Sequence, residues 1–433
     1  MQIRRGTPRV LLTLAGLCAA TAVATGCGSS DTSSTGSTGS NGTTASAAAT
    51  AAKPTGDPIK IMTMAPIEAS SGTSILSPET AAASQATVNK INAEGGINGR
   101  PIDLIICDEH SDPNAAAACA RKAVEEKVVA LVATYSQFSD KAYPILEKAK
   151  IANLGDIPVT PPDGTSDMSF PVNAGSAVLV AIGQAAAERP DCKKPGLVQI
   201  DSTAKDLITA GVFGGILVGG KQPAYNIALS PTSQDYSSQA NQAADQGDCV
   251  VMFTVPGTAL SFIPAFRQVS DQPIIASNNS VSAEVAKKLS SMLEGTVVPD
   301  YFPPYNSDAK ADFRETMDKY AETKDVDFTH YNATNAYVSV NVFKEIAETL
   351  GDNITNQTFL AALQKAKDVD TGGLTPPLNF TKANEWKGVP FQKRIFNRNM
   401  VYTKIEDGEQ VQDGGFRDLT KVGAEAFAAA AGK

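Results

Sequence analysis

Residues 89–108 read NKINAEGGINGRPIDLIICD, and this stretch decides the fold. It begins with the end of a helical pattern, and the pair Gly95-Gly96 supplies the conformational freedom with which a chain stops a helix and reverses. An apolar run at 102–106 follows directly and is typical of a buried strand. A helix that turns back into a strand in this way is part of a β-α-β unit, so the stretch predicts a parallel sheet.

The same alternation extends in both directions from this stretch. Short apolar runs bounded by turn residues predict strands, and the segments of about 10–15 residues between them predict helices. In a first series we expect strands at 59–66, 102–107, 128–133 and 151–154, and helices at 79–93, 114–127 and 141–149. In a second series, after residue 173, we expect strands at 196–201, 226–229, 250–255 and 274–276, and helices at 176–188, 204–218, 237–246, 259–269 and 282–292.

The last third of the chain departs from this alternation. Helices are expected near 307–323, 330–350 and 358–366, and a late strand at 396–405 ends in the turn signal Glu406-Asp407-Gly408. Such an order implies that the chain passes between two lobes more than once, and several crossings form a hinge beside a cleft. The sequence therefore predicts an α/β protein with two Rossmann-like lobes and a multi-crossing hinge, lobe 1 from 58–173 and 304–385 and lobe 2 from 174–303 and 386–433.

The N-terminus has the layout of a cleavable export signal. Three arginines precede an apolar run at 10–23, which is shorter than the roughly 20 residues of a transmembrane helix. Ala24-Thr25-Gly26-Cys27 then resembles the lipobox of bacterial lipoproteins, whereas cleavage of a plain secreted protein near Ala24 is the alternative. We expect a signal peptide at 1–26, lipidation of Cys27 and, at 27–57, a tether rich in Ser, Thr, Gly and Ala that cannot bury enough apolar surface to fold.

Charge disfavours nucleic acid and anionic membrane surfaces as partners of the folded part. The formal net charge is −9, and it becomes −12 once the three signal arginines are removed. No stripe of Lys and Arg runs along the sequence, and such a stripe is what binds phosphate groups.

Four cysteines lie beyond the signal peptide and Cys27. Cys107 ends a predicted strand and Cys119 lies in the helix that follows, whereas Cys192 and Cys249 each precede an apolar run of the second series. If those two runs are neighbouring parallel strands, both cysteines lie at the same edge of the sheet. Of the three possible pairings, we therefore expect Cys107–Cys119 and Cys192–Cys249. Four buried, reduced cysteines are the alternative.

Catalytic motifs are scarce in the chain. It has two histidines, no G-x-S-x-G motif and no H-E-x-x-H motif. Residues 215–221 match the spacing of a phosphate-binding loop, but they close a predicted helix and are followed by Gln222 rather than Ser or Thr. The acidic residues at 108–112 offer oxygen ligands for a metal, but Asp112 before a proline is more typical of a helix N-cap. We expect no enzyme activity, no metal and no cofactor.

Residues 89–100, together with 102–106, Asp108 and Asp112-Pro113, resemble the type I periplasmic binding proteins that serve ABC importers. The resemblance is to the branched-chain amino-acid (Leu/Ile/Val) binding group in particular, and residues 132–136 and 234–238 support it. It extends over nearly all of 58–407. Members of this family close two lobes on a small solute, and a membrane permease recognises the closed form.

The resemblance implies a ligand site built from loops at the carboxyl ends of strands, where doubly wound sheets bind ligands. In lobe 1, residues 136–137 take the place of a loop that meets the ligand carboxylate, and residues 155–157 complete that contact. In lobe 2, residues 202–205, 257–258 and 278–279 face the same cleft. The candidate ligand-binding residues are therefore Ser136, Gln137, Gly155, Asp156, Ile157, Ser202, Lys205, Thr258, Asn278 and Asn279.

The chain departs from the amino-acid binders at the site for the ligand ammonium. Those proteins use a carboxylate where this chain has Asn278, and tyrosines near Lys205 and Thr258. An amide cannot neutralise an ammonium, and an unpaired buried charge is costly. Either Asp156 or Asp201 takes the ammonium, or the ligand is an amide, urea, short carboxylate or aromatic acid rather than an amino acid.

These observations together predict a lipid-anchored, extracytoplasmic solute-binding protein on the outer face of the cell membrane. We expect it to capture a small polar solute, an amino acid or a related amide or carboxylate, and to deliver it as a monomer to an ABC permease. A ligand-sensing ectodomain that passes lobe closure to a membrane signalling partner is the alternative.

Overall fold

Strands and helices alternate along the chain in the computed structural model, which describes residues 53–68, 76–202, 204–323, 325–383, 386 and 392–431. The expected signal peptide, the expected lipidation site Cys27 and all but the end of the expected tether lie outside the described residues. The first series consists of β1 (Ile59–Ala65), α1 (Pro78–Ala93), β2 (Ile102–Asp108), α2 (Pro113–Glu125), β3 (Ala130–Val132), α3 (Ser139–Ala149), β4 (Ala152–Leu154), the 3-10 helix η1 (Pro161–Gly164) and β5 (Ser169–Phe170).

The later elements continue the alternation and then end in a hairpin and a helix. The second series consists of α4 (Ala177–Glu188), β6 (Pro195–Ile200), α5 (Lys205–Val218), β7 (Asn226–Leu229), α6 (Ser237–Gln246), β8 (Cys249–Phe253), α7 (Pro256–Arg267), β9 (Ile274–Ala276), α8 (Ala283–Lys288), α9 (Ser290–Leu293) and β10 (Val297–Asp300). The remaining elements are the 3-10 helix η2 (Asp308–Lys310), α10 (Ala311–Tyr320), α11 (Tyr331–Glu348), α12 (Asn356–Leu363), β11 (Asn399–Glu406), β12 (Glu409–Asp418) and α13 (Thr420–Ala431).

The turn between α1 and β2 forms as the sequence predicts. Gly95 and Gly96 have positive φ angles of 110° and 70°. A Cβ atom on Gly96 would lie 2.1 Å from the carbonyl oxygen of Arg100, so a larger residue has no room there. The two glycines therefore end α1 and return the chain to the sheet.

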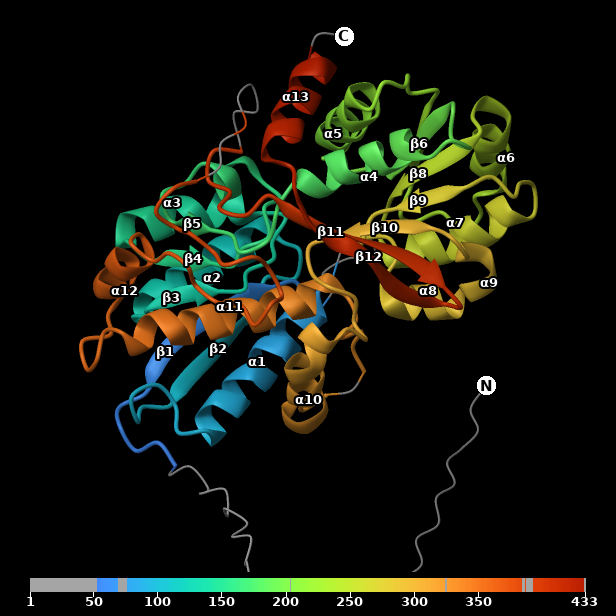
Figure 1. The fold of residues 1–433 in the computed structure, drawn as a ribbon. Coiled ribbons are helices and arrows are strands. Elements are labelled where there is room, and N and C mark those ends of the chain that lie inside the picture. The colour runs from blue at the N-terminus through green and yellow to red at the C-terminus, as the bar shows by residue number, and fades with distance from the viewer. Residues whose placement is uncertain are drawn as a thin grey trace, which may run out of the picture. The chain divides into compact units, whose positions relative to one another are not determined.

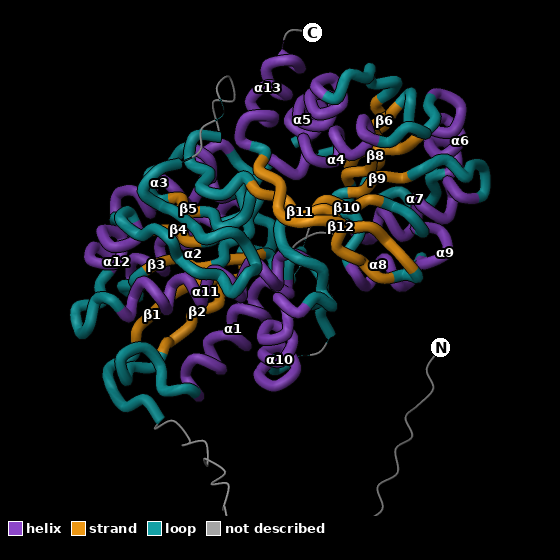
Figure 2. Tube along the Cα trace, viewed as in Figure 1, coloured by secondary structure: helices purple, strands orange, loops and turns teal. Residues whose placement is uncertain are grey.

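The strands form two separate sheets, which confirms the expected α/β class. The first sheet has the order β2-β1-β3-β4-β5, and its paired strands are parallel. The second has the order β12-β11-β10-β9-β8-β6-β7, in which β11 pairs antiparallel with both β10 and β12. Helices cover the sheets in Figures 1 and 2. The parallel first sheet and the mostly parallel second sheet are the two Rossmann-like units that the alternation predicts.

The chain passes between the two sheets more than once. It leaves the first sheet after β5, and it returns after β10 to helix α11, which packs against α1. It then reaches the second sheet again at β11, and α13 packs against α5 (Figure 1). This path agrees with a multi-crossing hinge, while the residue boundaries proposed for the two lobes stay a prediction.

Some expected elements differ in the structure. The helix expected at 282–292 is divided into α8 and α9, and the late strand begins at Asn399. Strands β5, β10 and β12 and helix α13 were not expected. β12 is mostly exposed, so it lacks the apolar alternation that signals a strand. Its pairing with β11 follows from the expected turn, where Asp407 and Gly408 both have the positive φ that a tight hairpin requires.

Candidate functional site

A cavity lies between the two sheets, where loops from both meet. The space between its walls, open solvent included, is about 830 Å³. Gln137 and Ile157, which follow β3 and β4, line it from the first sheet, and Ser202 and Asn279, which follow β6 and β9, line it from the second. This is the place where doubly wound sheets bind ligands, at the carboxyl ends of their strands.

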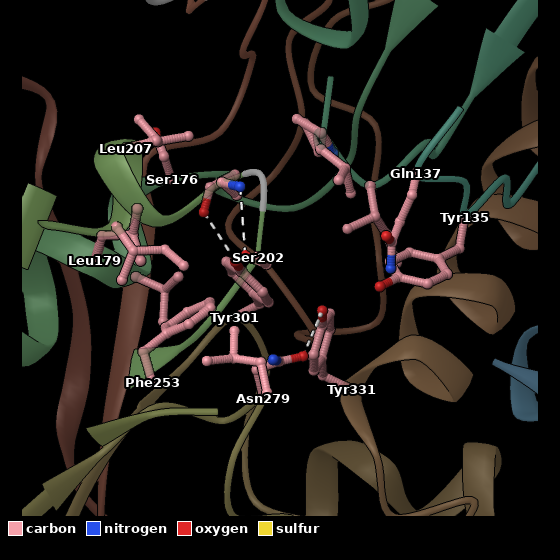
Figure 3. Close-up of a pocket in the computed structure, with 18 residues that line it drawn as sticks. Tyr135, Gln137, Ser176, Leu179, Ser202, Leu207, Phe253, Asn279, Tyr301 and Tyr331 are labelled. Atoms are coloured by element: carbon pink, nitrogen blue, oxygen red, sulfur yellow. Dashed lines mark hydrogen bonds between the residues drawn. The ribbon is translucent and has the colours of Figure 1, made fainter. Parts of the chain in front are cut away.

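One side of the cavity is strongly apolar. Val178 and Leu179 on α4, Leu207 and Ile208 on α5, and Phe253 at the end of β8 contribute to its lining. Figure 3 shows Leu179, Leu207 and Phe253 across the cavity from Tyr135 and Gln137. Among the described residues, no Asp, Glu, Lys, Arg or His lines it. The lining suits a ligand with an apolar body held by a few hydrogen bonds.

Three tyrosines supply much of the polar lining. The hydroxyl of Tyr301 donates to the carbonyl of Gly175 at 2.8 Å, and the hydroxyl of Tyr331 donates to Oδ1 of Asn279 at 3.4 Å. Burial raises the pKa of Tyr135 to about 12, so its hydroxyl remains protonated near neutral pH. The three tyrosines therefore make this part of the lining polar but give it no full charge.

Four of the ten candidate binding residues line this cavity, namely Gln137, Ile157, Ser202 and Asn279. Each of these residues follows a strand that the alternation of strand and helix patterns in the sequence predicts. Asn279 is held by its own contacts, because its side-chain amide donates to the carbonyl of Thr254 at 2.9 Å and its oxygen accepts from Tyr331.

Three candidates in the first lobe lie behind the lining of this cavity. The hydroxyl of Ser136 donates to Glu109 and accepts from the backbone N–H of Phe138. The carboxylate of Asp156 is buried and accepts from Tyr143 and from another hydroxyl of the same lobe. Burial, followed by the nearby charge of another carboxylate, raises the pKa of Asp156 well above its usual range.

Gly155 contributes backbone rather than a contact surface. Its φ of 73° lies in the left-handed region, and a Cβ atom there would lie 1.7 Å from Oγ of Ser339. Its carbonyl accepts a hydrogen bond of 2.7 Å from the side chain of Asn335. Gly155 thus lets β4 end in close contact with α11.

The other three candidates belong to the second lobe and also lie outside the cavity lining. Lys205 is exposed at the start of α5, and its Nζ lies 3.5 Å from the carboxylate of Asp201. Thr258 is buried on α7. The amide of Asn278 donates to buried Asp300 at 2.9 Å. Neither Asp156 nor Asp201, the two carboxylates considered for an ammonium, lines the cavity.

Several lining residues were not among the candidates. Ser176 and Tyr301 lie where the chain crosses between the sheets, and Phe253 is the last residue of β8. Ser176 occupies the N-cap position of α4 but makes no capping hydrogen bond. The expected start of that helix was the one sequence signal that could have indicated this serine.

Polar contacts also join the two lobes beside the cavity. Ser282, before α8, donates to Asp327 at 2.7 Å, and the hydroxyl of Thr329 accepts from the backbone N–H of Glu284 at 3.1 Å. Asp327 and Thr329 precede α11, which packs on the first lobe's helix α1. We name these four residues the interlobe latch.

Two clusters of side chains have the composition of a metal site, but members of each cluster make other bonds. In the first, Glu68, Asp108 and His110, the carboxylate of Asp108 accepts from the backbone N–H groups of Ile67 and Glu68. Nearby, Asp112 caps α2 by accepting from two backbone N–H groups at 2.9 Å, which confirms the N-cap interpretation.

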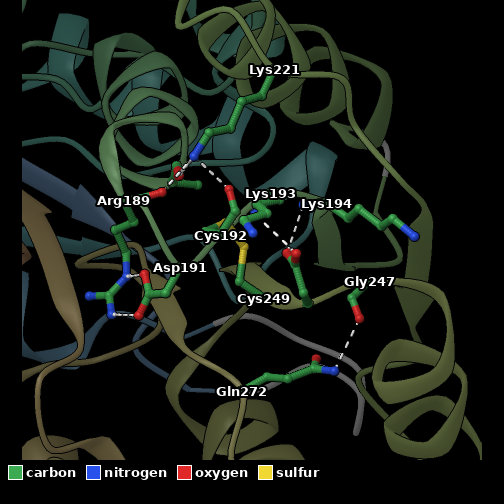
Figure 4. Close-up of a disulfide and its surroundings, with 11 residues drawn as sticks. Arg189, Asp191, Cys192, Lys193, Lys194, Lys221, Gly247, Cys249 and Gln272 are labelled. Atoms are coloured by element: carbon green, nitrogen blue, oxygen red, sulfur yellow. Dashed lines mark hydrogen bonds and ion pairs between the residues drawn. A yellow bond between two sulfur atoms is a disulfide. The ribbon is translucent and has the colours of Figure 1, made fainter.

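The second group contains a disulfide (Figure 4). Cys192 and Cys249 are joined, with Cα atoms 5.3 Å apart, beside the paired strands β6 and β8, and Cys107 and Cys119 are joined with Cα atoms 5.8 Å apart. Lys221 donates to the carbonyl of Cys192 at 2.6 Å and holds the same turn. The pairing is the one expected from the sequence, and its formation in the exported protein stays a prediction.

Comparisons with known proteins give fold relatives of this architecture. The chain resembles a fatty acid ABC transporter substrate-binding protein from Thermomonospora curvata, with 20% identity over 86% of this chain and 95% of that one and a TM-score of 0.68. It resembles a branched-chain amino acid ABC transporter protein from Thermus thermophilus with bound valine, with 15% identity over 83% and 96% and a TM-score of 0.68. It also resembles a solute-binding protein from Rhodopseudomonas palustris BisB5 in complex with 3,4-dihydroxybenzoic acid, with 17% identity over 83% and 97% and a TM-score of 0.66.

A search of curated proteins finds no match. No helix within the described residues is long and apolar enough to cross a membrane. A family model described as periplasmic binding protein matches residues 58–394, which is most of the chain. That family consists of binding proteins rather than enzymes, in agreement with the expectation from the sequence. Together with the two-sheet fold, this match shows that the chain belongs to the periplasmic binding protein family.

Proposed function

We propose that the protein is the solute-binding component of an ABC importer, which captures a small molecule between its two lobes and presents the closed form to a permease. The observation that carries this proposal is the cavity between the sheets, lined from both lobes by residues at the carboxyl ends of strands. Closure of the lobes would bury a ligand from two sides, and the several chain crossings allow such a motion.

The ligand has an apolar body and is not a free amino acid. No charged residue of the described chain lines the cavity, and both candidate carboxylates have other partners. Burying an ammonium without a counter-charge costs on the order of several kcal/mol. Of the solutes expected from the sequence, amides and carboxylates with an apolar body agree best with the lining. The fatty acid and dihydroxybenzoic acid named for two fold relatives are of this kind.

We infer lipid anchoring and the location of the protein from its sequence. The basic and apolar N-terminal segments and the small residues before Cys27 support export and lipidation, which would place the protein on the outer face of the cell membrane. Replacement of Cys27 by Ala should release the protein from the membrane fraction. We expect a monomer, because one chain supplies both halves of the site, and light scattering of the purified protein tests this.

A thermal-shift screen of the full chain tests the solute-binding function. The screen contains amino acids, amides, ureas, short-chain acids and aromatic acids. A ligand at 100 times its dissociation constant should stabilise the fold by about 2.7 kcal/mol. Loss of uptake of the same solute after gene deletion would support import, whereas normal uptake with an altered cellular response would favour the sensing alternative. If no solute stabilises the protein, the proposed function is wrong.

A further inference from the structure

We propose that the N-terminus of helix α4, with the hydroxyl of Ser176, binds the carboxylate of the ligand. The ligand would then be a monocarboxylic acid with an apolar aliphatic or aromatic body and no ammonium group. This inference rests on the proposed solute-binding function and specifies the class of its ligand.

Ser176 is a polar residue without a partner inside the cavity lining. It is 7% exposed, and its Oγ has no hydrogen-bond partner in the described part of the chain. A buried hydroxyl without a partner is costly, so most such groups are satisfied by protein, water or ligand. Serine at an N-cap usually accepts from a helix N–H, but Ser176 makes no such bond. Its hydroxyl is therefore free to donate to a ligand.

Two helix N-termini lie at this part of the cavity. α4 begins directly after Ser176, and α5 begins directly after Ala204, and both residues line the cavity together with Ser202. Figure 3 shows Ser176 and Ser202 on the same side of the cavity as Leu179 and Leu207. Each N-terminus carries a partial positive charge of roughly half an elementary charge. The pair attracts an anion where no Lys or Arg of the described chain lines the wall.

Three other polar residues of the lining are engaged with protein atoms. The hydroxyls of Tyr301 and Tyr331 already donate to protein oxygens, and Asn279 uses both ends of its amide. Ser176, whose Oγ has no partner in the described part of the chain, lies beside the apolar side chains of α4 and α5. A carboxylate at this place extends its apolar body along Leu179, Leu207 and Phe253, whereas an added ammonium would meet no anionic side chain.

Ligands that share a carbon chain but differ in charge can test whether the site prefers a carboxylate. Four probes share a 3-methylbutyl chain and differ in charge. Leucine is a zwitterion and 4-methylpentanoate is an anion, whereas 4-methylpentanamide is neutral and 3-methylbutylamine is a cation. Benzoate and benzamide repeat the comparison for an aromatic body. Calorimetry with the full chain should show that at least one carboxylate binds about tenfold or more tightly than its amide, and that leucine and the amine bind more weakly still.

The Ser176→Ala variant tests the residue itself. It should weaken binding of the preferred carboxylate about tenfold and leave binding of the amide unchanged, because only the charged ligand uses the full strength of the bond. The melting temperature should not fall, since the hydroxyl makes no hydrogen bond within the described part of the chain. Ser202→Ala provides a second variant at the same end of the cavity, and Ser261→Ala, on the exposed side of α7, is the matched control.

Several outcomes would overturn the inference. Leucine binding more tightly than 4-methylpentanoate, an amide equal to its acid, or carboxylate affinity unchanged in Ser176→Ala would each do so. Binding of a different solute class in the broad screen, with no carboxylate bound, would overturn the inference and leave the proposed function standing. If no solute of any class binds, both fail.

Discussion

The side-chain amide of Asn278 donates a hydrogen bond of 2.9 Å to the carboxylate of Asp300, and both side chains are buried. Asp300 also accepts from the backbone N–H of Tyr301 at 2.6 Å. Burial raises the pKa of Asp300, although the charge of Lys310 and the amide of Asn278 oppose that rise. Where the amino-acid binders that the sequence resembles carry a carboxylate for the ligand, this chain thus has an amide that serves a buried carboxylate of its own.

Asn278→Asp should destabilise the protein instead of restoring an amino-acid site. The new carboxylate would lie beside Asp300 in a buried place and remove its amide donor. We expect a loss of about 2–4 kcal/mol in the free energy of unfolding at pH 7.5, and a smaller loss at pH 5, where one carboxyl group of the pair can be protonated. Denaturant unfolding measures both. Asn379→Asp, an exposed site, is the control, and tight leucine binding by Asn278→Asp would contradict this interpretation.

Glu109 should make the protein less stable as the pH rises. Burial raises the pKa of Glu109 to about 7 from the ordinary 4.5. Because the folded state holds this proton more tightly, its stabilising effect is complete below pH 4.5 and is lost as the pH rises through 7. Glu109→Gln mimics the protonated side chain and can still accept from Ser136.

We therefore expect Glu109→Gln to match the parent protein at pH 4.5 and to exceed it by up to about 3 kcal/mol at pH 7.5. Chemical denaturation across this pH range measures the difference. Equal stability of the two proteins at every pH would show that the carboxylate is not held in its neutral form.

The two disulfides should differ in how much they stabilise the fold. Cys192 and Cys249 are 57 residues apart in sequence, whereas Cys107 and Cys119 are 12 apart. In the chain-entropy model a disulfide that closes a longer loop stabilises the fold more. Replacing Cys192 and Cys249 by Ala should therefore lower the free energy of unfolding by about 4 kcal/mol, and replacing Cys107 and Cys119 by about 3 kcal/mol. Peptide mapping without reduction checks the pairing, and free thiols or crossed pairs would contradict it.

The interlobe latch should hold the lobes closed. The double variant Ser282→Ala/Thr329→Val removes both interlobe hydrogen bonds, Ser282 to Asp327 and Glu284 to Thr329. It also removes the cap that Ser282 gives α8 and the bond from Thr329 to Asp327. Each lost hydrogen bond contributes about 0.5–1.5 kcal/mol, so a smaller fraction of the variant should be closed. The variant should therefore bind the solute found in the screen about tenfold more weakly than the parent protein. Without ligand, small-angle scattering should give a larger radius of gyration for this variant than for the parent protein. With saturating ligand, the two proteins should have the same radius of gyration.

A control for the latch removes hydroxyls that do not join the lobes. Ser261→Ala/Thr165→Val changes two such residues, one in each lobe, whose hydroxyls bond within their own segments. It should leave both affinity and scattering unchanged. If the latch variant also leaves both unchanged, these contacts do not govern closure.

Parts of the fold could be predicted because their patterns are local. β7, α6 and β9 have the expected bounds, since short apolar runs and turn residues mark their ends. β12 and β5 carried no such signal, because β12 is exposed and β5 has two residues. For the site, strand order places Gln137, Ile157, Ser202 and Asn279 at the cavity, whereas Ser176 and Tyr301 lie in crossings whose course depends on how the lobes meet.

The sequence by itself determined the alternating α/β architecture, the family resemblance and the expected cysteine pairing, because periodicity, turn residues and cysteine positions are local properties of the chain. Only the tertiary structure decided which polar side chains face the ligand. Ser136, Asp156 and Asn278 are polar residues at strand ends in the sequence, but in the fold each bonds to a neighbour distant along the chain or behind the cavity wall. The direction of a side chain and the partner that satisfies it depend on contacts between segments far apart in sequence, and these form only when the sheets and helices pack together.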